Sequence, residues 1–203
     1  MTEKDPQTAI TSYITDMLAL EQHISKALEG QVTDLKEYVE LTGELKGMLG
    51  TIGGHISTLE MLAKSRGGQG GGGAIKKIGS ALLGFGAAAV DMVRNEGMPK
   101  NLRDDYTACS LATIGYTMLH TTALALGDAE VGGIAQRHLS DYSKMVMRLN
   151  NIVPSATMRF LQEEGLPVRQ GALEEISRNI ETVWRDSARS TPEASEMNVT
   201  AKR

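Results

Sequence analysis

Apolar residues recur every three or four positions along four long stretches of this chain, and this spacing limits the folds that it can adopt. The first stretch carries Ile10, Tyr13, Met17, Leu20, Ile24 and Ala27, and the second carries Leu41, Leu45, Met48, Ile52, His55, Leu59 and Leu62. The third carries Cys109, Ala112, Tyr116, Leu119, Ala123 and Leu126, and the fourth carries Ala135, His138, Tyr142, Met145, Leu149 and Ile152. An alternating spacing of three and four places such side chains on one face of a helix. We therefore predict an all-α protein containing a four-helix bundle.

Helix-capping and helix-breaking residues predict how these helices are connected. Asp5-Pro6 is a typical helix start, and Pro154 is expected to end the fourth helix. Short turns join the first helix to the second and the third to the fourth, which makes each pair an antiparallel hairpin. The long connection between the hairpins holds a Gly-rich loop, residues 67–73, and a helix predicted over residues 74–96. Two helical hairpins joined by one long crossover form the ferritin-like arrangement.

The predicted organisation has three parts. The bundle with its crossover occupies residues 1–153, a helical appendage follows over residues 154–187, and residues 188–203 are expected to form a disordered tail. The appendage has its own apolar residues at helical spacing, namely Leu173, Ile176, Ile180, Val183 and Trp184.

Composition and charge exclude several classes of protein. The 21 basic and 25 acidic residues give a net charge of −4 without a basic stripe, so nucleic acid is not an expected partner. The single cysteine, Cys109, excludes an intrachain disulfide and a cysteine-based zinc site. The N-terminus lacks the apolar region of a secretory signal, and the most apolar run, residues 80–90, is shorter than the ~20 residues that span a bilayer. We expect a cytoplasmic protein with no transmembrane segment.

Two histidines occupy positions that a metal site would use. A ferritin-like two-metal site takes a Glu from each of two helices and a Glu-x-x-His pair from each of the other two. Here His55 and His138 both lie on the predicted inward faces, but Ile52 and Ala135 stand three residues before them. The first helix has Glu21 next to its apolar face, whereas the third helix has no carboxylate from residue 106 to residue 126.

These residues allow two interpretations. Glu21, His55 and His138, with Asp141 as a possible fourth ligand, could bind iron or another divalent metal such as zinc or manganese. Alternatively, the histidines are hydrogen-bonded core residues, Glu21 is a boundary residue, and no metal or other cofactor is bound. We favour the second interpretation because too few carboxylates remain for a redox-active pair of metals. Side chains that could bond to these groups from within the bundle are Tyr106, Tyr116 and Tyr142, although plain core packing is the preferred role for them.

Three short motifs resemble a known family. The stretch Leu20-Glu-Gln-His-Ile-Ser-Lys-Ala-Leu28 is similar to the first helix of the ferritin-like family of the YciE/YciF type. His55-Ile-Ser-Thr-Leu-Glu60 resembles the end of that family's second helix, and Ala123-Leu-Ala-Leu-Gly127 resembles its turn between the third and fourth helices. The resemblance covers roughly residues 10–150 and implies a bacterial, often dimeric, stress-associated bundle with a metal site. Glu21 and His55 match that family's motifs, whereas residues 51 and 52 of the second helix and residues 114–117 of the third depart from its acidic pattern.

Three functional hypotheses follow. In the favoured one, the protein is a ferritin-like bundle with a degenerate di-metal site that acts as a non-catalytic, stress-associated structural or binding protein and forms a homodimer. In the second, Glu21, His55, His138 and Asp141 bind metal in an oxidase or iron-storage bundle. In the third, the apolar segment of residues 74–94 binds a membrane surface or a protein partner.

Overall fold

A computed structural model describes residues 5–66 and 97–190 of the chain. These residues form five helices and no strand, which confirms the prediction of an all-α fold. The helices are α1 (Pro6–Asp34), α2 (Val39–Ser65), α4 (Met98–Ala125), α5 (Ala129–Glu163) and α6 (Ala172–Ser190). The predicted Gly-rich loop and crossover helix, and residues 191–203 of the predicted tail, lie outside the described residues.

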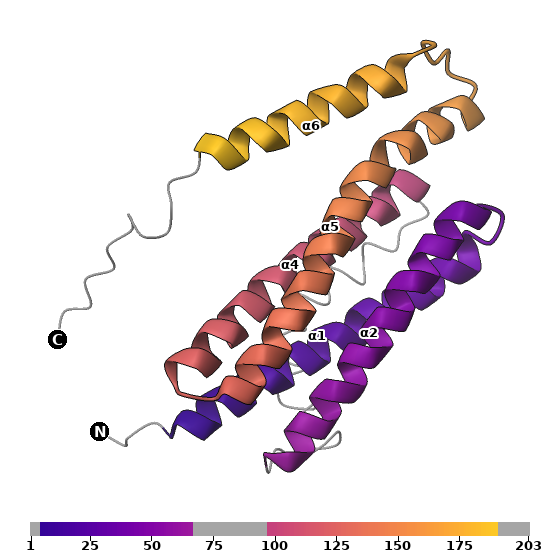
Figure 1. Cartoon of the computed structure of the whole chain (residues 1–203). Coiled ribbons are helices and arrows are strands. Elements are labelled where there is room, and N and C mark those ends of the chain that lie inside the picture. The colour runs from indigo at the N-terminus through magenta and orange to yellow at the C-terminus, as the bar shows by residue number, and fades with distance from the viewer. Residues whose placement is uncertain (1–4, 67–96, 191–203) are drawn as a thin grey trace. The chain divides into compact units, whose positions relative to one another are not determined.

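The chain divides into two compact units, the first ending at Val153 and the second beginning at Pro154. In the first unit, α1 packs against both α2 and α4, and two hairpins are visible, α1 with α2 and α4 with α5 (Figure 1). Its core holds large side chains with no exposed surface from every helix, among them Ile14, Leu45, Leu119 and Leu149. Close packing of four apolar helix faces therefore builds a bundle from residues 5–66 and 97–153.

Backbone chemistry explains the two short turns. Asp5 starts α1 by accepting hydrogen bonds from the amides of Gln7 and Thr8. The turn from α1 to α2 is closed by the Thr42 hydroxyl, which donates to the Leu35 carbonyl at 2.7 Å. The turn from α4 to α5 needs a left-handed residue, and Gly127 supplies it with a φ of 82°.

The last residue of α2 and the first residue of α4 lie at opposite ends of the bundle. At the end of α2, the Arg66 guanidinium bonds to the Asp128 carboxylate, which lies just before α5 begins. In the first part of α4, the Asp105 carboxylate accepts a hydrogen bond from Gln31, near the end of α1. Since α1 and α2 run antiparallel, the end of α2 and the start of α4 lie a helix length apart. This separation is what the ferritin-like arrangement of two hairpins requires, while the predicted crossover itself lies outside the described residues.

The fourth helix is longer than the sequence predicts. Pro154 was expected to end it, but α5 continues through Pro154 to Glu163. Proline removes one backbone donor and costs a helix interior about 3 kcal/mol, yet it does not forbid helical dihedral angles on its C-terminal side. A proline is therefore weaker evidence for a helix end than a positive-φ glycine such as Gly165, which follows the helix here.

The second unit contains the last turns of α5 and the helix α6. The helix α6 is strongly amphipathic, with its apolar residues spaced by three, four, three and one: Leu173, Ile176, Ile180, Val183 and Trp184. It ends at Ser190, three residues beyond the predicted limit of the appendage. None of the described helices has an apolar stretch sufficient to cross a membrane.

Candidate metal centre

Five polar side chains meet in the middle of the first unit, and we call them the Glu-His-Tyr cluster. Its members are Glu21 of α1, His55 of α2, Tyr116 of α4, and His138 and Tyr142 of α5. The two tyrosines and Glu21 have no exposed surface, and each histidine is only 5% exposed. All four helices of the bundle therefore send a polar group to one buried point.

Helical spacing explains why each group points inward. Glu21 lies four residues after Met17 and three before Ile24, both of which are buried. On α2, His55 lies three residues after Ile52 and four before Leu59, which are also buried. Residues three and four apart share a helix face, so a polar residue at such a position is carried into the core with its apolar neighbours.

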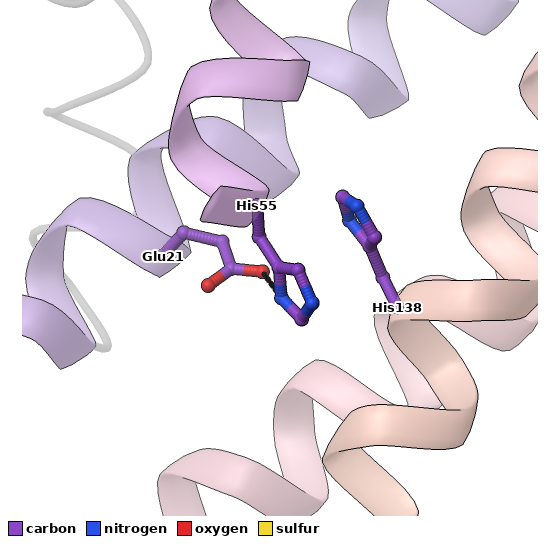
Figure 2. Close-up of side chains that lie close together, drawn as sticks. All are labelled: Glu21, His55 and His138. Carbon is purple, nitrogen blue, oxygen red and sulfur yellow. Dashed lines mark hydrogen bonds and ion pairs between the residues drawn. The ribbon is translucent and has the colours of Figure 1, made fainter. Parts of the chain in front are cut away.

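Both oxygens of the Glu21 carboxylate have hydrogen-bond partners. The Tyr116 hydroxyl donates to Oε1 and the Tyr142 hydroxyl donates to Oε2, each at 2.5 Å. The His55 ring nitrogen Nδ1 lies 3.1 Å from Oε1 (Figure 2). Burying an isolated carboxylate is strongly unfavourable, and charge-assisted hydrogen bonds of this kind offset that cost.

His55 is placed between two carboxylates. Its Nδ1 faces Glu21, and its Nε2 lies 3.4 Å from Oδ2 of Asp141. The Asp141 side chain is 37% exposed and its other oxygen accepts a hydrogen bond from Lys144. Each ring nitrogen of His55 therefore faces a carboxylate oxygen.

His138 is stacked on this ring and stays neutral. The two ring centroids are 3.8 Å apart and the planes meet at 16°. Burial, together with the positive charges of His55 and Arg137, lowers the pKa of His138 to about 3. The single proton of the Tyr116 hydroxyl goes to Glu21, so Nδ1–H of His138 donates to the Tyr116 oxygen, 2.9 Å away.

The two tyrosines are held as neutral phenols. Burial raises the pKa of Tyr116 and of Tyr142 well above the ordinary value, and the negative charge of Glu21 raises both further. Neither hydroxyl is therefore available as a phenolate ligand near neutral pH. Their role in the folded protein is to donate to Glu21.

The donor set does not fit a two-metal centre. Glu21 is the only carboxylate within the cluster, and the positions three residues before the histidines hold the fully buried Ile52 and Ala135. Within the described residues, the buried side-chain atoms without a hydrogen-bond partner are one oxygen of Gln31 and one of Asp105, neither of which belongs to the cluster. No orphaned group of the cluster therefore calls for a cation.

A single cation is chemically compatible with part of the cluster. One ligand atom each from Glu21, His55 and His138 can be chosen so that all lie within 4.8 Å of one another. Two imidazoles and one carboxylate are a donor set that suits zinc or ferrous iron. Figure 2 shows these three side chains converging from α1, α2 and α5.

The structure brings the sequence-predicted residues together. Glu21, His55 and His138 share the cluster, and Asp141 lies at its rim in contact with His55. Glu21 is fully buried, whereas its position beside the predicted apolar face suggested a boundary residue. For Tyr116 and Tyr142 the preferred prediction was plain core packing, yet both donate to Glu21. The only sequence feature that pointed to these hydrogen bonds was the position of both tyrosines on the predicted inward helix faces.

A surface groove of about 720 Å³ between α2 and α5 leads to the rim of the cluster. Its walls include Gly43, Gly47 and Thr51 on α2, and Asp141 and Arg148 on α5. Asp141 thus borders the groove while its Oδ2 faces His55. It is the group through which the cluster meets the solvent-facing side of the bundle.

Comparison with known proteins agrees with this architecture. No curated protein sequence matches the chain. Among solved structures, a protein from Xanthomonas campestris pv. campestris has a TM-score of 0.67 at 15% identity, covering 80% of this chain and 100% of that one. A structure of ferritin-like diiron-carboxylate proteins from Bacillus anthracis has a TM-score of 0.60 at 11% identity, covering 74% of this chain and 99% of that one.

These likenesses support a ferritin-like helical bundle, and at such low identity they concern the fold alone. The model of the family called domain of unknown function DUF892 matches residues 8–162, which include every helix of the bundle and every member of the Glu-His-Tyr cluster. The chain belongs to the DUF892 family and has a ferritin-like fold.

Proposed function

We propose that this protein is a non-catalytic ferritin-like bundle in which a hydrogen-bonded cluster takes the place of a metal centre. The observation that carries the proposal is the set of partners of Glu21, whose oxygens accept from Tyr116 and Tyr142 and also face His55. Binding a metal ion through Glu21 would displace hydrogen bonds that already compensate its buried charge. On α4, the side chain that enters the cluster is the phenol of Tyr116 and not a carboxylate.

The carboxylates at the centre of the bundle have protein partners without a metal ion. The His55 ring lies between the carboxylates of Glu21 and Asp141, and Asp141 is paired with Lys144. The neutral His138 ring packs on the His55 ring.

The biological part of the proposal is a structural or binding role in a bacterial stress response, exercised by a cytoplasmic homodimer. The resemblance to the YciE/YciF type supports the stress association. An exposed apolar strip on α4 supports the dimer, since Leu111, Ile114 and Met118 are 45%, 59% and 46% exposed and are spaced by three and four residues. The sequence between Asp105 and Asp128 contains no Asp, Glu, Lys or Arg, so this strip lacks the charges that usually keep a surface monomeric.

A second candidate function is the binding of one divalent cation by Glu21, His55 and His138, and the short distances among their ligand atoms favour it. Ligand atoms around one tetrahedral zinc ion lie about 3.4 Å apart. The three side chains would have to close around the ion, and Glu21 would have to exchange a tyrosine hydrogen bond for the metal. Such an ion would supply Lewis-acid or, with iron, redox chemistry.

Thermal unfolding with and without metal distinguishes the two candidates. The purified protein is measured after EDTA treatment and again with an excess of Zn²⁺, or of Fe²⁺ without oxygen. The proposal predicts equal Tm values, because a ligand that does not bind the native state cannot stabilise it. A rise in Tm that the paired substitutions His55→Ala and His138→Ala abolish would replace the proposal with the second candidate.

A further inference from the structure

A second buried polar contact lies outside the cluster and joins α1 to α4. The side-chain amide of Gln31 donates from Nε2 to Oδ1 of Asp105 at 2.7 Å. Asp105 is only 4% exposed. The remaining oxygen of each side chain, Oε1 of Gln31 and Oδ2 of Asp105, is buried without a donor. These are the two orphaned buried side-chain atoms of the described residues.

Each of these oxygens is buried without a donor, which destabilises the folded chain if both side chains can only accept there. An ionised aspartate has no proton to offer, so neither oxygen could be satisfied by the other. A protonated aspartic acid has one O–H, and a primary amide has one N–H and one C=O suited to a two-bond ring with it. A single proton on Oδ2 would therefore satisfy both orphaned oxygens at once.

We propose that Asp105 and Gln31 form a proton-dependent latch between α1 and α4, in which a carboxylic acid at Asp105 donates from Oδ2 to Oε1 of Gln31 while accepting from its Nε2. Loss of that proton leaves a buried charge and two acceptors facing each other, which weakens this contact. The latch holds the end of α1 against the first turns of α4. It is independent of the Glu-His-Tyr cluster, with which it shares no hydrogen bond.

The charges around Asp105 agree with a retained proton. The pKa of Asp105 is raised to about 7, mainly by burial and further by the nearby Asp104 carboxylate. The hydrogen bond from Gln31 acts in the opposite direction but is the weaker effect. On the same helix, burial raises the pKa of the Cys109 thiol to about 12, so that thiol is neutral. The group of α1 that faces Asp105 is the neutral amide of Gln31. Among the described residues of α2 and α5, no charged group shifts the pKa of Asp105.

The conservative substitution Asp105→Asn provides a matched control. Asparagine has the same shape, and its amide can donate to Oε1 of Gln31 and accept from its Nε2 at every pH. The experiment measures the unfolding equilibrium of the full chain and of Asp105→Asn between about pH 5 and about pH 8. The latch predicts that the folding equilibrium constant of the wild type falls relative to the variant by up to about tenfold per pH unit until the pH passes 7. A ratio that stays constant across this range overturns the proposal.

A second measurement needs no folded variant. The carboxyl carbon of Asp105 is followed by NMR in the wild-type chain during a pH titration. A midpoint near neutral pH supports the latch. A midpoint close to the ordinary aspartate value of about 4 contradicts it, because Asp105 would then be ionised throughout the physiological range.

Discussion

The imidazole rings of His55 and His138 lie face to face, with centroids 3.8 Å apart and planes inclined by 16°. Two positive rings at this distance would repel each other strongly in a buried site. Burial lowers the pKa of His138 to about 3, so His138 remains neutral, while His55 faces the carboxylates of Glu21 and Asp141. A neutral His138 stacked on the carboxylate-flanked ring of His55 is therefore a defining feature of this bundle centre.

The tyrosine hydrogen bonds to Glu21 should contribute directly to stability. In Tyr142→Phe, Oε2 of Glu21 loses its donor and remains buried, so we expect a loss of about 1–3 kcal/mol in the free energy of unfolding. Urea unfolding followed by circular dichroism measures it. Tyr106→Phe is the matched control, since Tyr106 lies on α4 outside the cluster and should cost far less. Equal losses in the two variants would show that the hydroxyl of Tyr142 does not support Glu21.

The neutral His138 predicts a pH dependence of definite sign. Its pKa in the folded chain, about 3, lies below the 6.5 of an unperturbed histidine, so between these values the unfolded chain binds more protons than the folded one. The stabilisation is complete above about pH 6.5 and is lost as the pH falls, at up to about 1.4 kcal/mol per unit.

Asp105 acts in the opposite direction. Its raised folded pKa, about 7, gives stability that is present below about pH 4 and is lost as the pH rises toward 7. The two effects offset each other in the wild type between about pH 4 and about pH 6.5. The His138→Gln side chain can still donate to Tyr116 but does not titrate. In this variant the free energy of unfolding should therefore decline as the pH rises, as measured by urea unfolding at each pH. An unchanged pH profile in this variant would mean that His138 is not held neutral.

Two ion pairs of Arg66 join the end of α2 to the start of α5. Arg66 bonds to Asp128 and Glu130, and Asp128 also accepts from the Val131 amide as a helix cap. Asp128→Ala removes the cap and the ion pair, and should cost about 1–2 kcal/mol. Asp128→Asn keeps the cap and loses the charge, so it should cost about half as much or less. Thermal unfolding of both variants measures this, and an Asn variant as unstable as the Ala variant would argue against a capping role.

The exposed strip on α4 predicts the site of dimerisation. Ile114→Glu places a charge in the middle of Leu111, Ile114 and Met118, and sedimentation velocity should then show a monomer where the wild type is a dimer. Met61→Glu, at a 65% exposed position on α2, is the control and should leave the dimer intact. A monomeric wild type, or a dimer that resists Ile114→Glu, would rule out this strip as the interface.

Helical periodicity was sufficient to predict the four helices of the bundle and the inward placement of both histidines. His55 and His138 could be predicted because they replace apolar residues in an uninterrupted spacing of three and four. Glu21 was harder to place, since an apolar face drawn through Leu20 leaves the neighbouring carboxylate at the boundary. The actual face runs through Met17, Ile24 and Leu28, and it carries Glu21 fully inside.

The partners of Glu21 could not be predicted in the same way. The hydroxyls of Tyr116 and Tyr142 reach Glu21 from two other helices, at sequence separations of 95 and 121 residues. Periodicity indicates that a side chain points inward, but it does not determine which groups from different helices meet at the same height. The register between helices decides this, and it depends on packing of the whole core.

The metal content of the purified protein tests the central claim most directly. The chain and its His55→Ala, His138→Ala double variant are produced in cells supplied with iron and zinc, purified without chelators, and analysed by inductively coupled plasma mass spectrometry. The hydrogen-bonded cluster predicts the same small, substoichiometric metal content in both proteins. One iron or zinc ion per chain in the wild type, absent from the double variant, would contradict it.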